Sequence, residues 1–108
     1  MNYKKLSRVI DMANLPPKRT GLPYQIWYSA QEPRHKPRIK VDLPDGRNLS
    51  IEIESHKVTG PVNKISSSDL NKILEWIDLN KEILLKYWNE ARSGSIDNVD
   101  VFRALKKY

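Results

Sequence analysis

The sequence predicts an α+β domain: a three- to four-stranded antiparallel sheet, two C-terminal helices packed on one face, and a short N-terminal helix. Apolar residues alternate on both sides of a Pro44-Asp45-Gly46 turn, which is typical of a β-hairpin. After residue 67, apolar residues recur at helical spacing in two successive stretches. The 108 residues, 39% hydrophobic and 30% charged, suit one globular core.

The N-terminal region is basic. Apolar residues at i, i+3, i+4 and i+7 from Leu6 to Ala13 predict a short amphipathic helix over residues 3–13, which the Pro16-Pro17 pair cannot continue. The following PPKRTG is expected to be a basic loop. We therefore divide the chain into a basic N-terminal helix and loop (1–21), a single α+β domain (22–92) and a basic C-terminal tail (93–108).

The first expected strand runs from Leu22 to Ala30. Its alternation puts Trp27 on the face opposite to that of Leu22 and Ile26. Pro23 indicates an edge strand or a late start. For Trp27 two interpretations stay open: either both faces of the sheet are covered, or Trp27 lies on an exposed functional surface.

The hairpin that follows has a register fixed by its turn. A three-residue loop at residues 44–46 puts apolar residues opposite each other, whereas a two-residue loop would oppose apolar and polar residues throughout. The expected pairs are Leu43 with Arg47, Val41 with Leu49, Ile39 with Ile51, Arg38 with Glu52 and Lys36 with Glu54. The charged pairs then have an ordinary explanation as cross-strand ion pairs.

The C-terminal half is predicted to be mainly helical. Residues 56–62 begin as a turn and offer a short further strand, which Gly60-Pro61 ends. Two helices are expected at 68–79 and 81–92, the first capped by a serine and the second by Asn80, with one bent helix as the alternative. The tail 95–108 suits a helix, a strand or a mobile basic arm. The expected core comprises Leu22 through Ile26, Ile39, Val41, Ile51, Ile53, Ile73, Ile77, Leu84 and Trp88.

Composition excludes several kinds of site. The chain has no cysteine, so disulfides and thiolate metal sites are excluded, and neither histidine stands in a metal-ligand spacing. We expect no cofactor, no metal and no membrane contact, and a cytoplasmic location. The first forty residues hold nine of the 19 Lys and Arg residues but only two of the 13 acidic ones. This imbalance favours an anionic partner, either RNA or DNA or an acidic protein.

The densest run of cations is Arg34-His35-Lys36-Pro37-Arg38, which we call the basic knot. Arginine and lysine carry permanent charge that suits phosphate groups, and an exposed aromatic ring can stack on a base. The expected site for a nucleic acid or a partner comprises Arg34, Lys36, Arg38, Lys40 and Trp27.

A rival interpretation is enzymatic. A metal-independent ribonuclease needs a proton donor, a proton acceptor and a cation for the phosphorane, and His35 and His56 would supply the first two. The hairpin register brings both histidines to its open end. The close pair Glu52 and Glu54 has a simpler explanation as surface carboxylates on one strand face.

Three features together resemble a known family. A Trp/Tyr strand leads into a proline- and histidine-containing junction, an IEIE strand follows, and the helical segment LNKILEWIDLNKEILLKYWNEA closes the pattern. From Ile26 to Ala91 the chain resembles the bacterial domain-of-unknown-function 4160 family. Members usually carry a Pro-His-Phe-His-Val element where this chain has residues 37–41, so cations replace both histidines.

The resemblance implies a protein partner, encoded by a neighbouring gene, and a component of a toxin–antitoxin module with an RNA-directed role. Our leading hypothesis is therefore a small basic interaction protein of such a module that binds nucleic acid or an acidic protein, rather than an enzyme. The alternatives are the ribonuclease toxin and a structural subunit of a larger assembly, which would form an oligomer.

Overall fold

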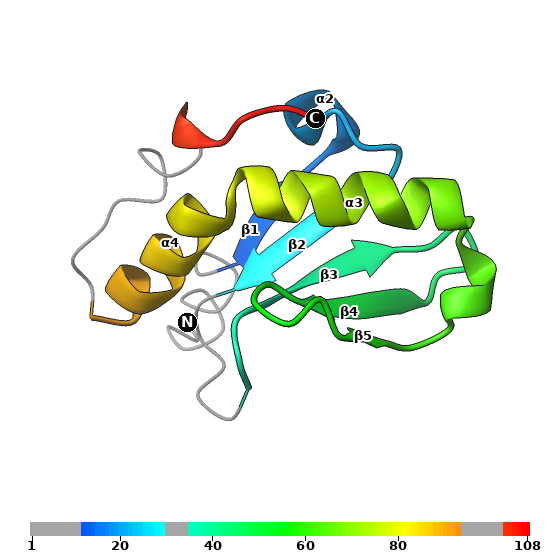
Figure 1. Cartoon of the computed structure of the whole chain (residues 1–108), viewed down its shortest axis with the longest axis horizontal. Helices are drawn as coiled ribbons and strands as arrows, with labels where there is room; N and C mark the ends of the chain where they lie inside the picture. The colour runs from blue at the N-terminus through cyan, green and yellow to red at the C-terminus, as the bar shows by residue number, and fades with distance from the viewer. Residues whose placement is uncertain (1–11, 30–34, 94–102) are drawn as a thin grey trace, which may run out of the picture.

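The computed structural model describes residues 12–29, 35–93 and 103–108. It confirms the α+β class: one antiparallel sheet with two long helices on one side (Figure 1). In chain order the elements are β1 Met12–Leu15, α2 Pro17–Thr20, β2 Ile26–Ser29, β3 Arg38–Asp42, β4 Asn48–Glu52, β5 Val58–Thr59, the 3₁₀ helix Val62–Lys64, α3 Ser67–Leu79 and α4 Lys81–Ser93.

In the described part of the chain the sheet has five strands in the order β1-β2-β3-β4-β5, so the expected count of three to four is wrong. The additional strand is β1, in which Asn14 pairs with Trp27 and Leu15 with Ile26. Residues 12 and 13 are thus extended rather than helical, because an isolated helix this short is marginal in water and pairing with β2 outweighs its periodicity. The remainder of the expected helix, residues 3–11, lies outside the described residues.

The expected PPKRTG loop is also wrong in part, since it contains the short helix α2. Pro17 stands at its first position, where a missing N–H costs nothing. Gly21 ends it with φ of 79°, and its N–H donates to the Pro17 carbonyl over 2.7 Å. A helix of four residues is too short to produce a periodic pattern of apolar residues, so the sequence pattern could not predict it.

The hairpin register is confirmed. Val41 pairs with Leu49, Ile39 with Ile51 and Arg38 with Glu52. The Leu43 N–H donates to the Arg47 carbonyl, and Gly46 takes the positive φ of 88° that the loop requires. β5 supplies the short further strand, and β2 starts late, at Ile26, as Pro23 had indicated.

The two C-terminal helices are separate, as expected, and both lie on the same face of the sheet (Figure 1). The Ser66 hydroxyl accepts the Asp69 N–H and caps α3. Asn80 separates α3 from α4. We predicted that its side chain would cap α4, and that prediction is wrong. The side chain bonds to the Trp76 carbonyl and to the backbone of Lys106, which is distant in sequence.

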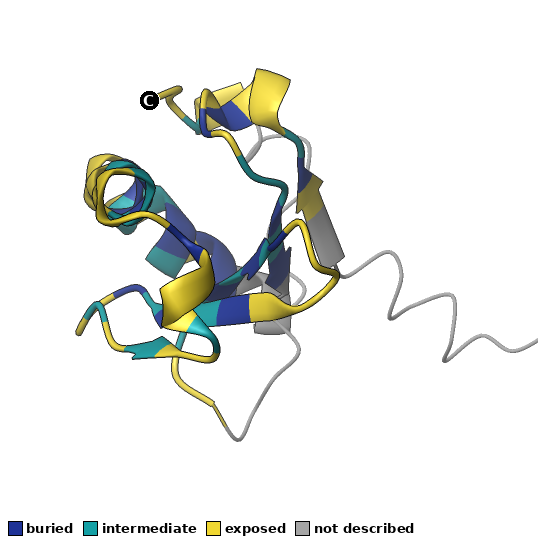
Figure 2. Cartoon of the chain, turned by 90° about the vertical axis from the view of Figure 1, so that its right-hand side faces the viewer, coloured by how far each residue is buried: buried dark blue, intermediate teal, exposed yellow. Residues whose placement is uncertain are grey.

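The core lies between the sheet and the helices (Figure 2). The expected core residues are buried, except that Pro23 is exposed and Tyr24 and Gln25 are half-buried. Seven further buried residues complete it: Leu15, Tyr28, Leu43, Leu49, Ile65, Trp76 and Tyr87.

Tyr28 fastens α4 to the sheet. Its hydroxyl donates to the Leu84 carbonyl over 2.6 Å. Its ring centroid lies 5.4 Å from that of Tyr87 and 5.9 Å from that of Trp88. One strand residue thereby contacts three positions of α4.

The segment 103–108 lies against the domain. The Trp76 indole N–H donates to the Lys106 carbonyl over 3.0 Å, and the Tyr108 N–H donates to the Thr20 carbonyl over 2.7 Å. Leu105 packs on the core. This part of the expected tail is therefore held between α2 and α3, while residues 94–102 lie outside the described residues. No helix in the described part of the chain has the length and apolar character needed to cross a membrane.

Candidate functional site

The face of the sheet turned away from α3 and α4, which we call the outer face, is polar. Strand alternation sends the apolar residues of β3 and β4 inward, where they are buried, and leaves their neighbours half-buried or exposed. By strand register the outer face includes Asn14, Trp27, Arg38, Lys40, Asp42, Asn48, Ser50, Glu52 and Thr59. Gln25 precedes β2, and its carbonyl accepts the Asp42 N–H.

Trp27 is the large aromatic residue of the outer face. It lies between Asn14 on β1 and Lys40 on β3. Its indole N–H donates to the Asp42 carboxylate over 2.7 Å, so the ring is held at a defined position. The side chain is half-buried. The structure thus puts Trp27 on the face turned away from α3 and α4 without exposing it fully, which falls between the two interpretations from the sequence.

Two cations share this face with Trp27. Lys40 is flanked by Trp27 on β2 and Ser50 on β4, so its nearest cross-strand neighbours are uncharged. Arg38 lies opposite Glu52, as the hairpin register predicted. Lys40 is therefore the less compensated of the two charges. Arg34, the first member of the expected site, lies outside the described residues.

The described end of the basic knot borders an open hollow of about 220 Å³. Lys36 and Pro37 line it together with Glu52, Glu54 and Ser55. The Ser55 hydroxyl donates to Glu52 over 2.6 Å. Lys36 thus faces carboxylates rather than an open anion site, so phosphate binding is better served by Lys40.

His56 occupies the turn between β4 and β5 with φ of 64°, a left-handed conformation that is unusual for a residue other than glycine. Its Nε2 lies 2.7 Å from Asp78 Oδ1 on α3. This pair fastens the turn to the helix. His35 is exposed, and within the described residues the two imidazoles share no hydrogen bond.

Within residues 12–29, 35–93 and 103–108, no group of three or more His, Asp or Glu side chains is arranged to hold a metal ion. Comparisons with protein-family models, with curated proteins and with solved structures found no match. The resemblance to the domain-of-unknown-function 4160 family therefore stays a hypothesis from the sequence.

Sequence reasoning missed Asp42 as the partner of Trp27. Both residues were assigned correctly to the faces of their own strands. The missing information was the pairing of β2 with β3, which puts Trp27 opposite Lys40. The connection between those strands has no turn signature comparable to Pro44-Asp45-Gly46, so the register could not be read from it.

Proposed function

We propose that this protein binds single-stranded nucleic acid through the outer face of its sheet, as a component of a toxin–antitoxin-like module. The observation that carries the proposal is Trp27, fixed by Asp42 and adjacent to Lys40 on a face that α3 and α4 leave uncovered. An aromatic ring beside a cation on a flat sheet is the arrangement by which sheet-based RNA-binding modules stack bases and hold phosphates.

The spacing of the strands supports this arrangement. Adjacent strands lie about 4.8 Å apart, so a base stacked on Trp27 has its phosphate within reach of the long Lys40 side chain. Arg38 lies two residues further along the same strand and the same face. The pair Trp27–Asp42 also lowers the cost of ordering the indole on binding, because its position is already fixed.

A single strand fits better than a duplex. The outer face is a flat sheet surface with an aromatic ring, and unpaired bases can lie flat on such a ring, whereas bases inside a duplex are already stacked. The major groove of a duplex admits an α-helix or a two-stranded β-ribbon. In this protein the outer-face residues Trp27, Lys40 and Ser50 lie instead on strands that are paired within the sheet.

The test is binding of labelled oligouridine and oligodeoxythymidine, followed by fluorescence anisotropy. Trp27→Ala is expected to weaken binding about 5- to 150-fold, which corresponds to the loss of one stacked base. Asn71→Ala, an exposed change on α3 and therefore away from the outer face, serves as the control and is expected to bind as wild type does. Absence of binding by the wild-type protein, or equal affinity of the Trp27→Ala variant, would refute the proposal.

The same samples separate binding from cleavage. We expect the RNA to be bound and left intact. If the wild-type protein cuts it and the His35→Ala, His56→Ala double variant does not, the ribonuclease hypothesis replaces ours.

The module proposal draws its support from the family resemblance. It expects the product of the neighbouring gene to co-purify with this protein when the two are co-expressed. A solitary gene whose product is harmless on expression would count against the module while leaving the nucleic-acid proposal to its own test.

A further inference from the structure

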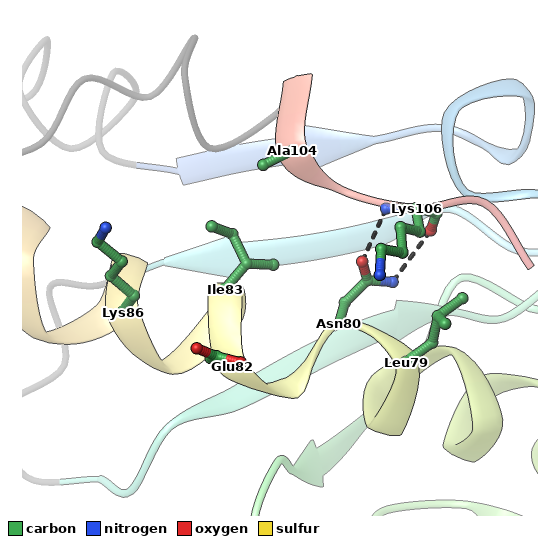
Figure 3. Close-up of a pocket in the computed structure, with 7 residues that line it drawn as sticks. All are labelled: Leu79, Asn80, Glu82, Ile83, Lys86, Ala104 and Lys106. Atoms are coloured by element: carbon green, nitrogen blue, oxygen red, sulfur yellow. Dashed lines mark hydrogen bonds between the residues drawn. The ribbon is translucent and has the colours of Figure 1, made fainter.

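Two segments from distant parts of the sequence form one surface. α2 and the 103–108 segment meet where the Tyr108 N–H donates to the Thr20 carbonyl. The contact is close: a Cβ on Gly21 would lie 2.8 Å from the Tyr108 carbonyl oxygen, so a glycine is required there. Asn80 holds the other side of the segment, since its amide bonds to both the N–H and the carbonyl of Lys106 (Figure 3).

This contact assembles cations that the sequence keeps apart. α2 presents two of them and the 103–108 segment presents three, and all five are exposed. We call this group the basic ridge: Lys18, Arg19, Arg103, Lys106 and Lys107. Neither residues 12–29 nor residues 103–108 contain an acidic residue. Such clustering costs electrostatic repulsion, which an anionic ligand would relieve.

Among the described residues, two carboxylates come close to the 103–108 part of the basic ridge. Glu75 bonds to the Tyr108 hydroxyl and raises the pKa of that phenol. Glu82 lines a hollow of about 290 Å³ with two lysines, Lys86 and Lys106 (Figure 3). At this hollow the described lining residues thus include two lysines and one carboxylate.

We propose that the basic ridge is a second phosphate-binding surface, which holds the backbone of the same nucleic-acid strand that stacks on Trp27. This inference rests on the proposed function. The chain itself links the two surfaces: Asn14, which neighbours Trp27 on the outer face, precedes α2 by only a few residues. A nucleic-acid strand that leaves the outer face across β1, the edge strand of the sheet, would next meet α2, the helix that carries Lys18 and Arg19.

The chemistry favours nucleic acid over an acidic protein. The basic ridge presents permanent charges, and Tyr108 (48% exposed) supplies an aromatic ring among them. A regular series of phosphates can engage cations on α2 and on the 103–108 segment together, and aromatic rings among cations are typical of single-strand sites.

The test measures affinity for oligouridine of about 20 nucleotides across about 50 to 300 mM KCl. Two double variants each remove two charges of the basic ridge: Lys18→Ala with Arg19→Ala, and Lys106→Ala with Lys107→Ala. Each is expected to reduce the log–log salt slope by about 1.4 and to weaken binding about 10- to 30-fold near 0.1 M salt. Lys64→Ala with Lys72→Ala removes equal charge from the 3₁₀ helix and α3 and serves as the control.

The outcomes distinguish the two proposals. If Trp27→Ala weakens binding but both ridge variants match the control, the basic ridge proposal is refuted and the proposed function stands. If the wild-type protein does not bind the oligonucleotide, both fail together. If ridge variants lose affinity only for an acidic protein partner and keep it for RNA, the surface serves that protein instead and our inference is wrong.

Discussion

Asn80 is the residue by which the sequence-distant 103–108 segment is fastened, and Asn80→Ala tests the importance of that attachment. The side chain is 2% exposed. Its amide donates to the Trp76 carbonyl over 3.1 Å and to the Lys106 carbonyl over 3.0 Å, and its oxygen accepts the Lys106 N–H over 2.7 Å. Alanine removes all three bonds at once.

The expected loss of stability follows from these bonds. A typical hydrogen bond contributes about 0.5 to 1.5 kcal/mol net, and a buried group left without a partner costs about as much again. The Lys106 carbonyl keeps the Trp76 indole as a donor, and Lys106 is exposed, so its freed N–H can reach water. We therefore expect Asn80→Ala to lower the free energy of unfolding by about 2 to 3 kcal/mol.

The assay is urea unfolding followed by far-UV circular dichroism, together with amide hydrogen exchange. Asn71→Ala, an exposed change on α3, is the control and should cost less than about 0.5 kcal/mol. In the Asn80→Ala variant the amides of Lys106 and Tyr108 should exchange much faster than in wild type. If stability falls no further than in the control, or if those amides stay protected, Asn80 does not fasten the segment.

Two further predictions concern single tertiary contacts. Burial raises the pKa of Tyr28 well above its ordinary value, so the stability that this residue contributes is complete below pH about 10 and is lost as the pH rises further. Tyr28→Phe should cost about 1 kcal/mol at pH 7 and flatten that alkaline loss, as measured by urea unfolding; an unchanged alkaline loss would contradict it. At His56 alanine should cost about 0.5 to 1 kcal/mol by removing the bond to Asp78, whereas glycine should cost less because it also relieves the positive φ. If thermal melts give the glycine variant a lower melting temperature than the alanine variant, this prediction is wrong.

The sequence was most informative where local chemistry determines geometry. The Pro44-Asp45-Gly46 loop, with Gly46 at positive φ, fixed the register of β3 and β4 completely. The serine run at residues 66–68 and the helical spacing located α3 and α4 within about one residue. These features depend on residues that are neighbours in the chain, so they can be predicted from the sequence without a structure.

The failures share one cause, which is contact between residues far apart in sequence. Leu15 belongs to a strand because β2 is beside it, and no local preference of that segment required this. Asn80 looked like a helix cap, yet its side chain bonds to Lys106. Likewise Trp27, Lys40 and Asp42 are brought together only through the pairing of β2 with β3.

The bond between Thr20 and Tyr108 also has a consequence for synthesis of the protein. It joins residues near the two ends of the described chain, so it cannot form until residue 108 has left the ribosome. The sheet and α3, by contrast, are complete in the chain well before that point. Since closing such a long loop also carries a large entropic cost, we expect this contact to form last in folding. A nascent chain would then acquire its sheet surface early and its basic ridge only after residues 103–108 have left the ribosome, which separates the two proposed contacts in time.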